Sequence, residues 1–151
     1  MKTSASLVHR SAQIIYSATK DLIRLSSIYQ DEFRDYYKSD RHLSFMKEFC
    51  TIKVCGPRQS GHSTAIQFLT FEFDKPCVIS WTLKMSKRIK EGASPNTDFA
   101  SVKSLTRLAG KTYDIIFVDT ASLLSKTDIE NVYDAAAPCL KRKPSFLIFM
   151  E

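Results

Sequence analysis

Apolar residues in the first 48 positions recur every three or four residues, which is the spacing of one face of an α-helix. The predicted apolar face consists of Leu7, Ile14, Ala18, Leu22 and Leu25, widened by Ile15 and Ile23. The polar residues Ser26 and Ser27 predict a break, followed by a second helical segment over Ile28–Tyr37 and a third one capped by Asp40. We therefore expect residues 1–48 to form a helical extension packed on the rest of the chain.

From residue 49 onward, short apolar runs alternate with segments of helical spacing. The runs that predict strands are Phe49–Cys55, Cys77–Trp81, Tyr113–Asp119 and Phe146–Met150. The predicted helices cover Ser63–Phe73, Leu83–Glu91, Phe99–Leu108 and a segment that begins at Ser125 or Thr127. Runs that are apolar throughout are typical of parallel strands buried on both faces. The alternation predicts a three-layer α/β domain over residues 49–151, with a mostly parallel sheet of about four to five strands.

The overall composition predicts a globular protein with an excess of positive charge. Apolar residues make up 44% of the chain and charged residues 25%, which argues against disorder. The net charge of +6 favours nucleic acid or another polyanion as a partner, with a merely solvated basic face as the alternative. The candidate nucleic-acid contacts form two clusters, Lys84, Lys87, Arg88 and Lys90, and Lys141, Arg142 and Lys143.

The cysteines and the lengths of the apolar runs indicate in which cellular compartment the protein is expected. Cys50, Cys55, Cys77 and Cys139 show no paired spacing and no histidine at zinc-ligand spacing, which favours reduced, structural thiols. No segment has the apolar core of a signal peptide, and none approaches the roughly 20 apolar residues of a membrane span. These patterns predict a cytoplasmic protein without a membrane partner.

A glycine-containing segment between the first predicted strand and its helix carries the candidate chemistry. Gly56 and Gly61 are five residues apart, which matches the phosphate-binding pattern G-x-x-x-x-G-K-[ST] except that His62 replaces the lysine. Such a loop wraps a phosphate with backbone N–H groups at the N-terminus of a helix. The predicted nucleotide-binding residues are Gly56, Pro57, Arg58, Gln59, Ser60, Gly61, His62, Ser63 and Thr64. Asp119 ends a later apolar strand, where such proteins place a carboxylate that holds Mg²⁺.

Residues 49–151 resemble the core of P-loop NTPases. Within that superfamily, GPRQSGHST resembles the RQ-x-G-K-[ST] loop, or Walker A motif, of viral and phage large terminases, the DNA-packaging motors. VDTASLL is similar to their acidic motif, and helicase-like ATPases are the next nearest pattern. The resemblance implies ATP or another nucleotide with Mg²⁺ as cofactor, contacted by Arg58, by Ser63 and, through water, by Asp119. It also implies a viral protein that handles DNA in the host cytoplasm.

Two departures from the family pattern predict weak catalysis. Histidine is shorter than lysine and mostly neutral at pH 7, so His62 replaces a full positive charge with a partial one. Thr120 follows Asp119 where the terminase pattern has a glutamate that polarises water. Glu151 ends the last predicted strand, and its place relative to the site stays open. Hydrolysis is therefore expected to be impaired or absent.

Three functional hypotheses follow from the sequence. The first is a degenerate P-loop protein that binds a nucleotide or phosphate group while it handles nucleic acid of the viral type. The second is a pseudo-ATPase that serves as an interaction module, whose N-terminal helices bind a protein partner or another copy of the chain. The third is a slow ATPase that is completed in trans by an oligomer.

Overall fold

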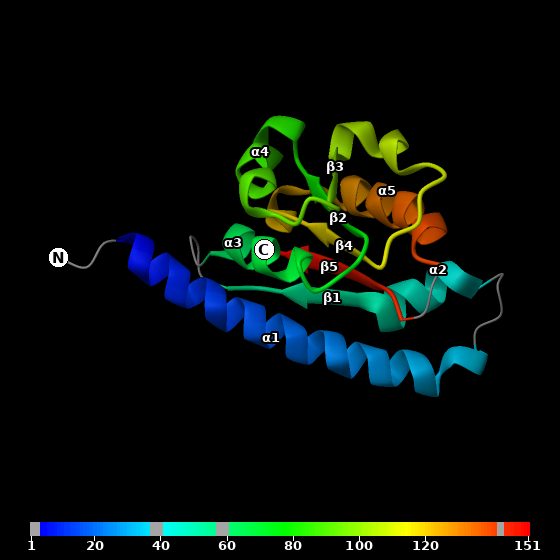
Figure 1. Ribbon diagram of the computed structural model, residues 1–151. Coiled ribbons are helices and arrows are strands. Elements are labelled where there is room, and N and C mark those ends of the chain that lie inside the picture. The colour runs from blue at the N-terminus through cyan, green and yellow to red at the C-terminus, as the bar shows by residue number, and fades with distance from the viewer. Residues whose placement is uncertain (1–3, 37–40, 57–60, 142–143) are drawn as a thin grey trace.

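A computed structural model describes residues 4–36, 41–56, 61–141 and 144–151. Five parallel strands form one sheet in the order β1-β5-β4-β2-β3 (Figure 1). The strands are β1 (Thr51–Val54), β2 (Pro76–Ser80), β3 (Asp98–Ser101), β4 (Ile115–Val118) and β5 (Phe146–Met150). The predicted fold class is confirmed, and the sheet of the described residues is parallel throughout.

Helices cover both faces of this sheet. The α-helices are α1 (Ser4–Glu32), α2 (His42–Phe45), α3 (His62–Thr70), α4 (Leu83–Gly92) and α5 (Lys126–Ala136). A π-helical turn spans Met46–Cys50, and short 3₁₀ helices span Arg34–Tyr36, Val102–Leu108, Ala121–Leu123 and Ala137–Cys139. None of the described helices is both long and apolar enough to span a bilayer.

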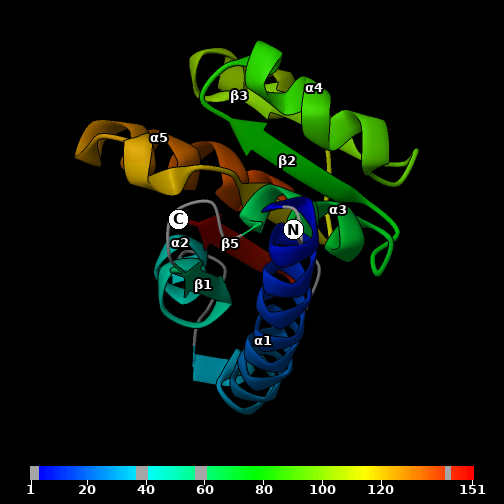
Figure 2. The ribbon, with the colours of Figure 1, turned by 90° about the vertical axis from the view of Figure 1, so that its left-hand side faces the viewer.

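Alternate residues of the strands point to opposite faces of the sheet and belong to two separate apolar cores. One core holds Val78, Phe117 and Ile148 with residues of α1, α3 and α4. The other holds Ile79 and Val118 with residues of α2, α5 and the 3₁₀ helix after β3. Figure 2 shows α1 and α3 on one side of the sheet and α5 and α2 on the other. This period-2 division explains why β4 and β5 are apolar throughout, whereas the edge strand β1 exposes Lys53.

The segment predicted as a helix over Phe99–Leu108 is instead a strand followed by a 3₁₀ helix. Its first part, β3, pairs with β2 from Asp98 to Ser101. The residues that follow, Val102–Leu108, form 3₁₀ turns that are interrupted by a kink at Ser104 (φ −136°, ψ 44°). Hydrogen bonding to the free edge of β2 outweighs the local helical spacing, so the helix prediction was wrong.

Helix α1 continues through the break predicted at Ser26 and Ser27. The Ser27 hydroxyl donates to the Ile23 carbonyl 2.9 Å away, and the Ser26 hydroxyl donates to the Phe49 carbonyl. Both hydroxyls are thereby satisfied without opening the helix, and Ser26 also attaches α1 to the turn before β1. The predicted second segment is the end of α1 and the 3₁₀ helix Arg34–Tyr36, whereas Asp40 lies outside the described residues.

The face of α1 that packs on the core only partly matches the predicted one. Over residues 9–32 the buried side chains are Ala12, Ile15, Thr19, Ser26 and Gln30, of which Ile15 belongs to the predicted face. Three of them are polar, and their side chains hydrogen-bond within the helix or to neighbouring backbone. The more regular apolar face predicted from the sequence, represented by Ile14, Leu22 and Leu25, is exposed.

Gln30 links the N-terminal helix to the last strand and supports a prediction. Its side-chain amide donates to the Ser145 carbonyl (2.8 Å), and its oxygen accepts from the Ser145 N–H (3.2 Å). Gln30→Leu leaves both buried backbone groups unpaired, so we expect it to lower the free energy of unfolding by about 2–4 kcal/mol in urea denaturation. Gln13→Leu, at an exposed position of the same helix, is the control and should change it by less than about 0.5 kcal/mol. Equal effects of the two changes would contradict this role.

Candidate phosphate-binding site

The carboxyl ends of three neighbouring strands bring the predicted site residues to one edge of the sheet. Strand β5 lies between β1 and β4, so Gly56, Glu151 and Asp119 follow three adjacent parallel strands. Helix α3 begins at the same edge with His62. Ligands of open parallel sheets bind at this edge, where connections leave toward opposite faces.

The described end of the glycine loop at Gly61 has a conformation that suits the start of a phosphate-binding helix. Gly61 is the N-cap of α3 and has a φ of 88°, in the left-handed region that favours glycine. Its carbonyl accepts the first helical hydrogen bond, from Ala65 N–H at 2.9 Å. The N-terminal turn of α3 contains His62, Ser63 and Thr64, and its free N–H groups carry the positive end of the helix dipole. The remaining predicted loop residues, Pro57, Arg58, Gln59 and Ser60, lie outside the described residues.

Ser63 and Asp119, predicted as the magnesium contacts, lie side by side. The Ser63 hydroxyl donates to the Asp119 carboxylate, with Oγ 3.3 Å from Oδ1 and 3.5 Å from Oδ2. Asp119 is only 5% exposed, and this burial raises the pKa of its carboxyl although hydrogen bonds from Ser63 and Thr120 oppose the shift. A buried carboxylate beside a hydroxyl is a favourable place for a hard cation, which takes oxygen ligands.

His62 stands at the start of α3 in a half-buried position. Burial lowers the pKa of its imidazole below the usual value, although the negative charges of Asp119 and Glu151 favour the protonated form. At neutral pH the side chain is therefore mainly uncharged before any anion binds. The position that holds a lysine in the family pattern thus contributes little positive charge.

Thr120 has an unusual backbone conformation directly after Asp119. Its φ of 55° and ψ of 45° are left-handed, and no other non-glycine residue in the described ranges has a positive φ. A β-branched residue in this region is strained, at a cost of about 1–3 kcal/mol. Its backbone and side chain favour the ionised form of Asp119 and so oppose the rise of the carboxyl pKa. The strained turn thus stabilises the charged carboxylate while offering no second acid at this position.

The structure adds two residues that sequence reasoning left open or missed. Glu151 N–H donates to the Val54 carbonyl (2.9 Å), and Cys55 Sγ donates to Glu151 Oε2 (3.1 Å), so this glutamate borders the loop. Ser80 ends β2 next to Asp119 in the strand register, is 1% exposed, and its hydroxyl has no hydrogen-bond partner among the described protein groups. A serine that ends an apolar run gives no sequence signal for this neighbourhood, because only strand order creates it.

The described members of the two basic clusters lie on different faces of the sheet. Lys84, Lys87, Arg88 and Lys90 are exposed on α4, and none of them forms an ion pair with another described residue. Helix α4 packs on the same face of the sheet as α3, whereas Lys141 follows the 3₁₀ helix Ala137–Cys139 on the other face. Arg142 and Lys143 lie outside the described residues.

The oxygen donors at the site are too few for a permanently bound metal ion. They suit a metal ion that binds together with a phosphate group. Within the described ranges, no group of three or more histidine, cysteine, aspartate or glutamate side chains could hold a metal ion. Ser63 and Asp119 supply two oxygen donors beside a helix N-terminus. Mg²⁺ typically takes one or two protein oxygens and completes its shell with phosphate and water.

The buried charge of Asp119 predicts an unusual response of stability to mutation. Because its pKa is raised in the folded state, the ionised carboxylate lowers the stability of the metal-free protein at neutral pH. Asp119→Asn should therefore raise the melting temperature at pH 7. The gain should shrink as the pH falls toward about 4, where the unfolded carboxylate also becomes protonated.

Differential scanning fluorimetry between pH 4 and pH 7.5 measures this gain, with Asp134→Asn, at an exposed position of α5, as the control. A lower melting temperature of Asp119→Asn at pH 7 would show that the hydrogen bonds outweigh the burial of charge.

Comparison with known proteins gives structural neighbours only. No protein-family model matches the chain, and no curated protein matches it. Two solved structures of the large terminase ATPase domain of Thermus phage P74-26, one of them a point mutant, superpose with a TM-score of 0.50. They are 16% and 15% identical in sequence, and the alignment covers 80% of this chain and 67% or 66% of theirs. The chain is thus similar in fold to about two thirds of that terminase ATPase domain.

Proposed function

We propose that the chain binds ATP or another nucleotide, or a phosphate group alone, together with Mg²⁺, at the N-terminus of α3. The observation that supports this proposal is the hydrogen bond from Ser63 to buried Asp119, two residues that are 56 positions apart in sequence. It lies next to Gly61, which has a left-handed backbone conformation. The same pairing of a loop hydroxyl with a strand-end carboxylate holds the nucleotide-bound Mg²⁺ in P-loop NTPases. The terminase-like fold supports this proposal.

In the proposed complex the groups of the site have separate tasks. Backbone N–H groups between Gly56 and Thr64 would contact phosphate oxygens, aided by the dipole of α3. Ser63 and Asp119 would hold Mg²⁺, whose positive charge would offset the negative charge of the buried carboxylate. Arg58 is proposed to add positive charge from within the loop.

Hydrolysis is proposed to be impaired or absent for two reasons. His62 is mostly neutral and shorter than lysine, so it stabilises developing charge on the phosphates only weakly. Thr120 has no carboxylate to orient water. It lies in a strained turn that stabilises the charged form of Asp119. A slow ATPase that an oligomer completes in trans stays the alternative.

Nucleic-acid handling of the viral type is the second part of the proposal. The four unpaired basic side chains of α4 support it, since α4 begins just beyond the carboxyl end of β2, at the same edge as the phosphate site. Trp81 adds an aromatic surface there, with Lys103 Nζ 5.6 Å from its ring centroid. A pseudo-ATPase that only binds a protein partner is the alternative.

Calorimetric titration with Mg-ATP tests the nucleotide proposal. We expect binding by the unmodified chain and loss of detectable binding in Ser63→Ala/Asp119→Ala, because this variant lacks both oxygen donors for the metal. Ser122→Ala/Asp134→Ala, at exposed positions outside the site, is the control and should bind as the unmodified chain does. No heat at millimolar nucleotide with protein shown to be folded would reject the proposal.

Restoring the two altered positions tests why hydrolysis is weak. His62→Lys should tighten Mg-ATP binding by about tenfold or more, since it adds a full charge next to the phosphates. His62→Lys/Thr120→Glu should raise the rate of phosphate release above that of either single variant. Phosphate release by the unmodified chain that already matches the double variant would contradict the assignment of both residues.

A further inference from the structure

Helix α1 carries a second apolar stripe that contacts nothing in the described chain strongly enough to bury it. We define the outer stripe as Ile14, Ala18, Leu22, Leu25, Ile28 and Tyr29. Its members repeat at spacings of three and four, as along the seam of a helix pair. Ile14 is 70% exposed, Ile28 60% and Leu25 49%. Contiguous exposed apolar side chains of this kind mark interaction surfaces rather than ordinary solvent-facing positions.

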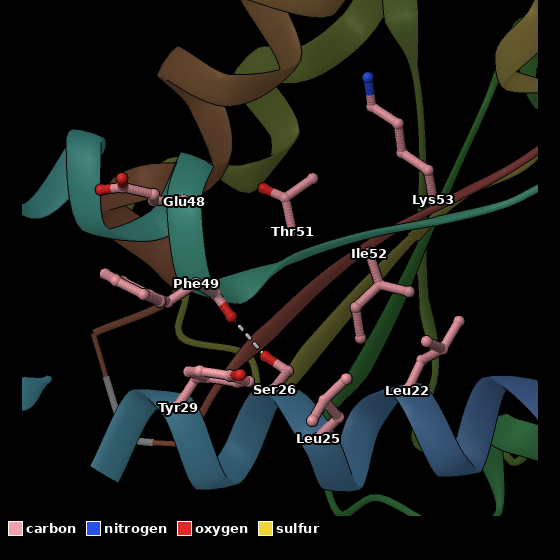
Figure 3. Close-up of a pocket in the computed structure, with 9 residues that line it drawn as sticks. All are labelled: Leu22, Leu25, Ser26, Tyr29, Glu48, Phe49, Thr51, Ile52 and Lys53. Carbon is pink, nitrogen blue, oxygen red and sulfur yellow. Dashed lines mark hydrogen bonds between the residues drawn. The ribbon is translucent and has the colours of Figure 1, made fainter. Parts of the chain in front are cut away.

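The outer stripe borders a groove of about 380 Å³ between α1 and β1. Leu22 and Leu25 point across the groove toward Ile52 of β1 (Figure 3). Phe49 and Tyr29 line one end of it (Figure 3). The groove therefore continues the outer stripe, although Glu48, Thr51 and Lys53 also belong to its lining, and a single occupant would cover both.

The architecture of the helical layer indicates that this occupant is a helix. On this face of the sheet α4 contacts α3, and α3 contacts α1, so the three helices lie next to one another. Strand β1 is the edge strand below the last helix of this row. Packed helices lie about 8–10 Å apart, so the next helix of the layer would lie beside α1 and over β1, in the groove.

The charges beside the stripe indicate which helix fits. Arg10 lies four residues before Ile14, and Glu32 lies four residues after Ile28; both are exposed and neither forms an ion pair with another described residue. Two α1 helices in antiparallel orientation would place each Arg10 near Glu32 of the other copy. Asp21, which such an arrangement places at the centre, is already paired with Arg24 at 3.7 Å.

From these observations we propose that two copies of the chain associate through antiparallel contact of their α1 helices. The outer stripe of each copy lies against the groove and stripe of the other, and reciprocal Arg10–Glu32 pairs fix the orientation. Such an arrangement is isologous, so a two-fold axis near Leu22 closes it as a dimer. The dimer does not depend on the proposed nucleotide site, and its test needs no nucleotide.

Sedimentation velocity of the full chain without nucleotide, from about 1 to about 100 μM, tests the dimer. We expect a monomer–dimer equilibrium in this range and a dissociation constant at least about tenfold weaker for Leu25→Glu, which places a charge in the apolar contact. Leu123→Glu is the matched control, because Leu123 is 56% exposed but lies far from α1 in the 3₁₀ helix after β4. It should dimerise as the unmodified chain does.

A charge reversal tests the antiparallel orientation. Arg10→Glu should weaken the dimer, and Arg10→Glu/Glu32→Arg should restore it, since the opposite charges then meet again with their positions exchanged. A monomer at every concentration, or an equal effect of Leu25→Glu and Leu123→Glu, would overturn the proposal. If Arg10→Glu/Glu32→Arg does not regain dimerisation, the antiparallel arrangement is excluded. Circular dichroism confirms that each variant is folded.

Discussion

The parallel direction of all five strands is the constraint on which the candidate site depends. It brings every strand's carboxyl end to one edge, and insertion of β5 between β1 and β4 sets the spacing of the groups there. Residues as distant in sequence as Gly56, Asp119 and Glu151 become neighbours through strand order alone. The contact of Ser63 with Asp119 follows from this arrangement, because α3 must begin where β1 ends.

Two unfavourable features meet at this edge. A nearly buried carboxylate keeps its charge only at a cost, and the threonine that follows adopts a conformation that its branched side chain disfavours. Neither feature benefits a protein that needs only a stable scaffold. Together with Gly61, both features suit the metal–phosphate complex proposed above, since its Mg²⁺ would supply the missing positive charge.

The part of the site formed by local sequence was predictable, and the part formed by strand order was not. Gly61, Ser63 and Asp119 could be identified because loop spacing and strand-end position are sequence properties. Ser80 gave no signal, because its neighbourhood comes from pairing of β2 with β4. For the same reason β3 was predicted as a helix, since its edge pairing with β2 is invisible in the local pattern. In α1 the most regular apolar face was mistaken for the packed one, because polar residues with tertiary hydrogen bonds occupy the buried face.

The position of β5 has a consequence for synthesis on the ribosome. Among the described strands it is translated last, yet it separates β1 from β4 and provides hydrogen bonds to both. Until residues 146–150 have left the exit tunnel, the nascent chain exposes two unpaired apolar strand edges, and Gln30 of α1 lacks its partner Ser145. The sheet therefore closes only after translation of this segment, and until then the two open edges are available for pairing with other chains.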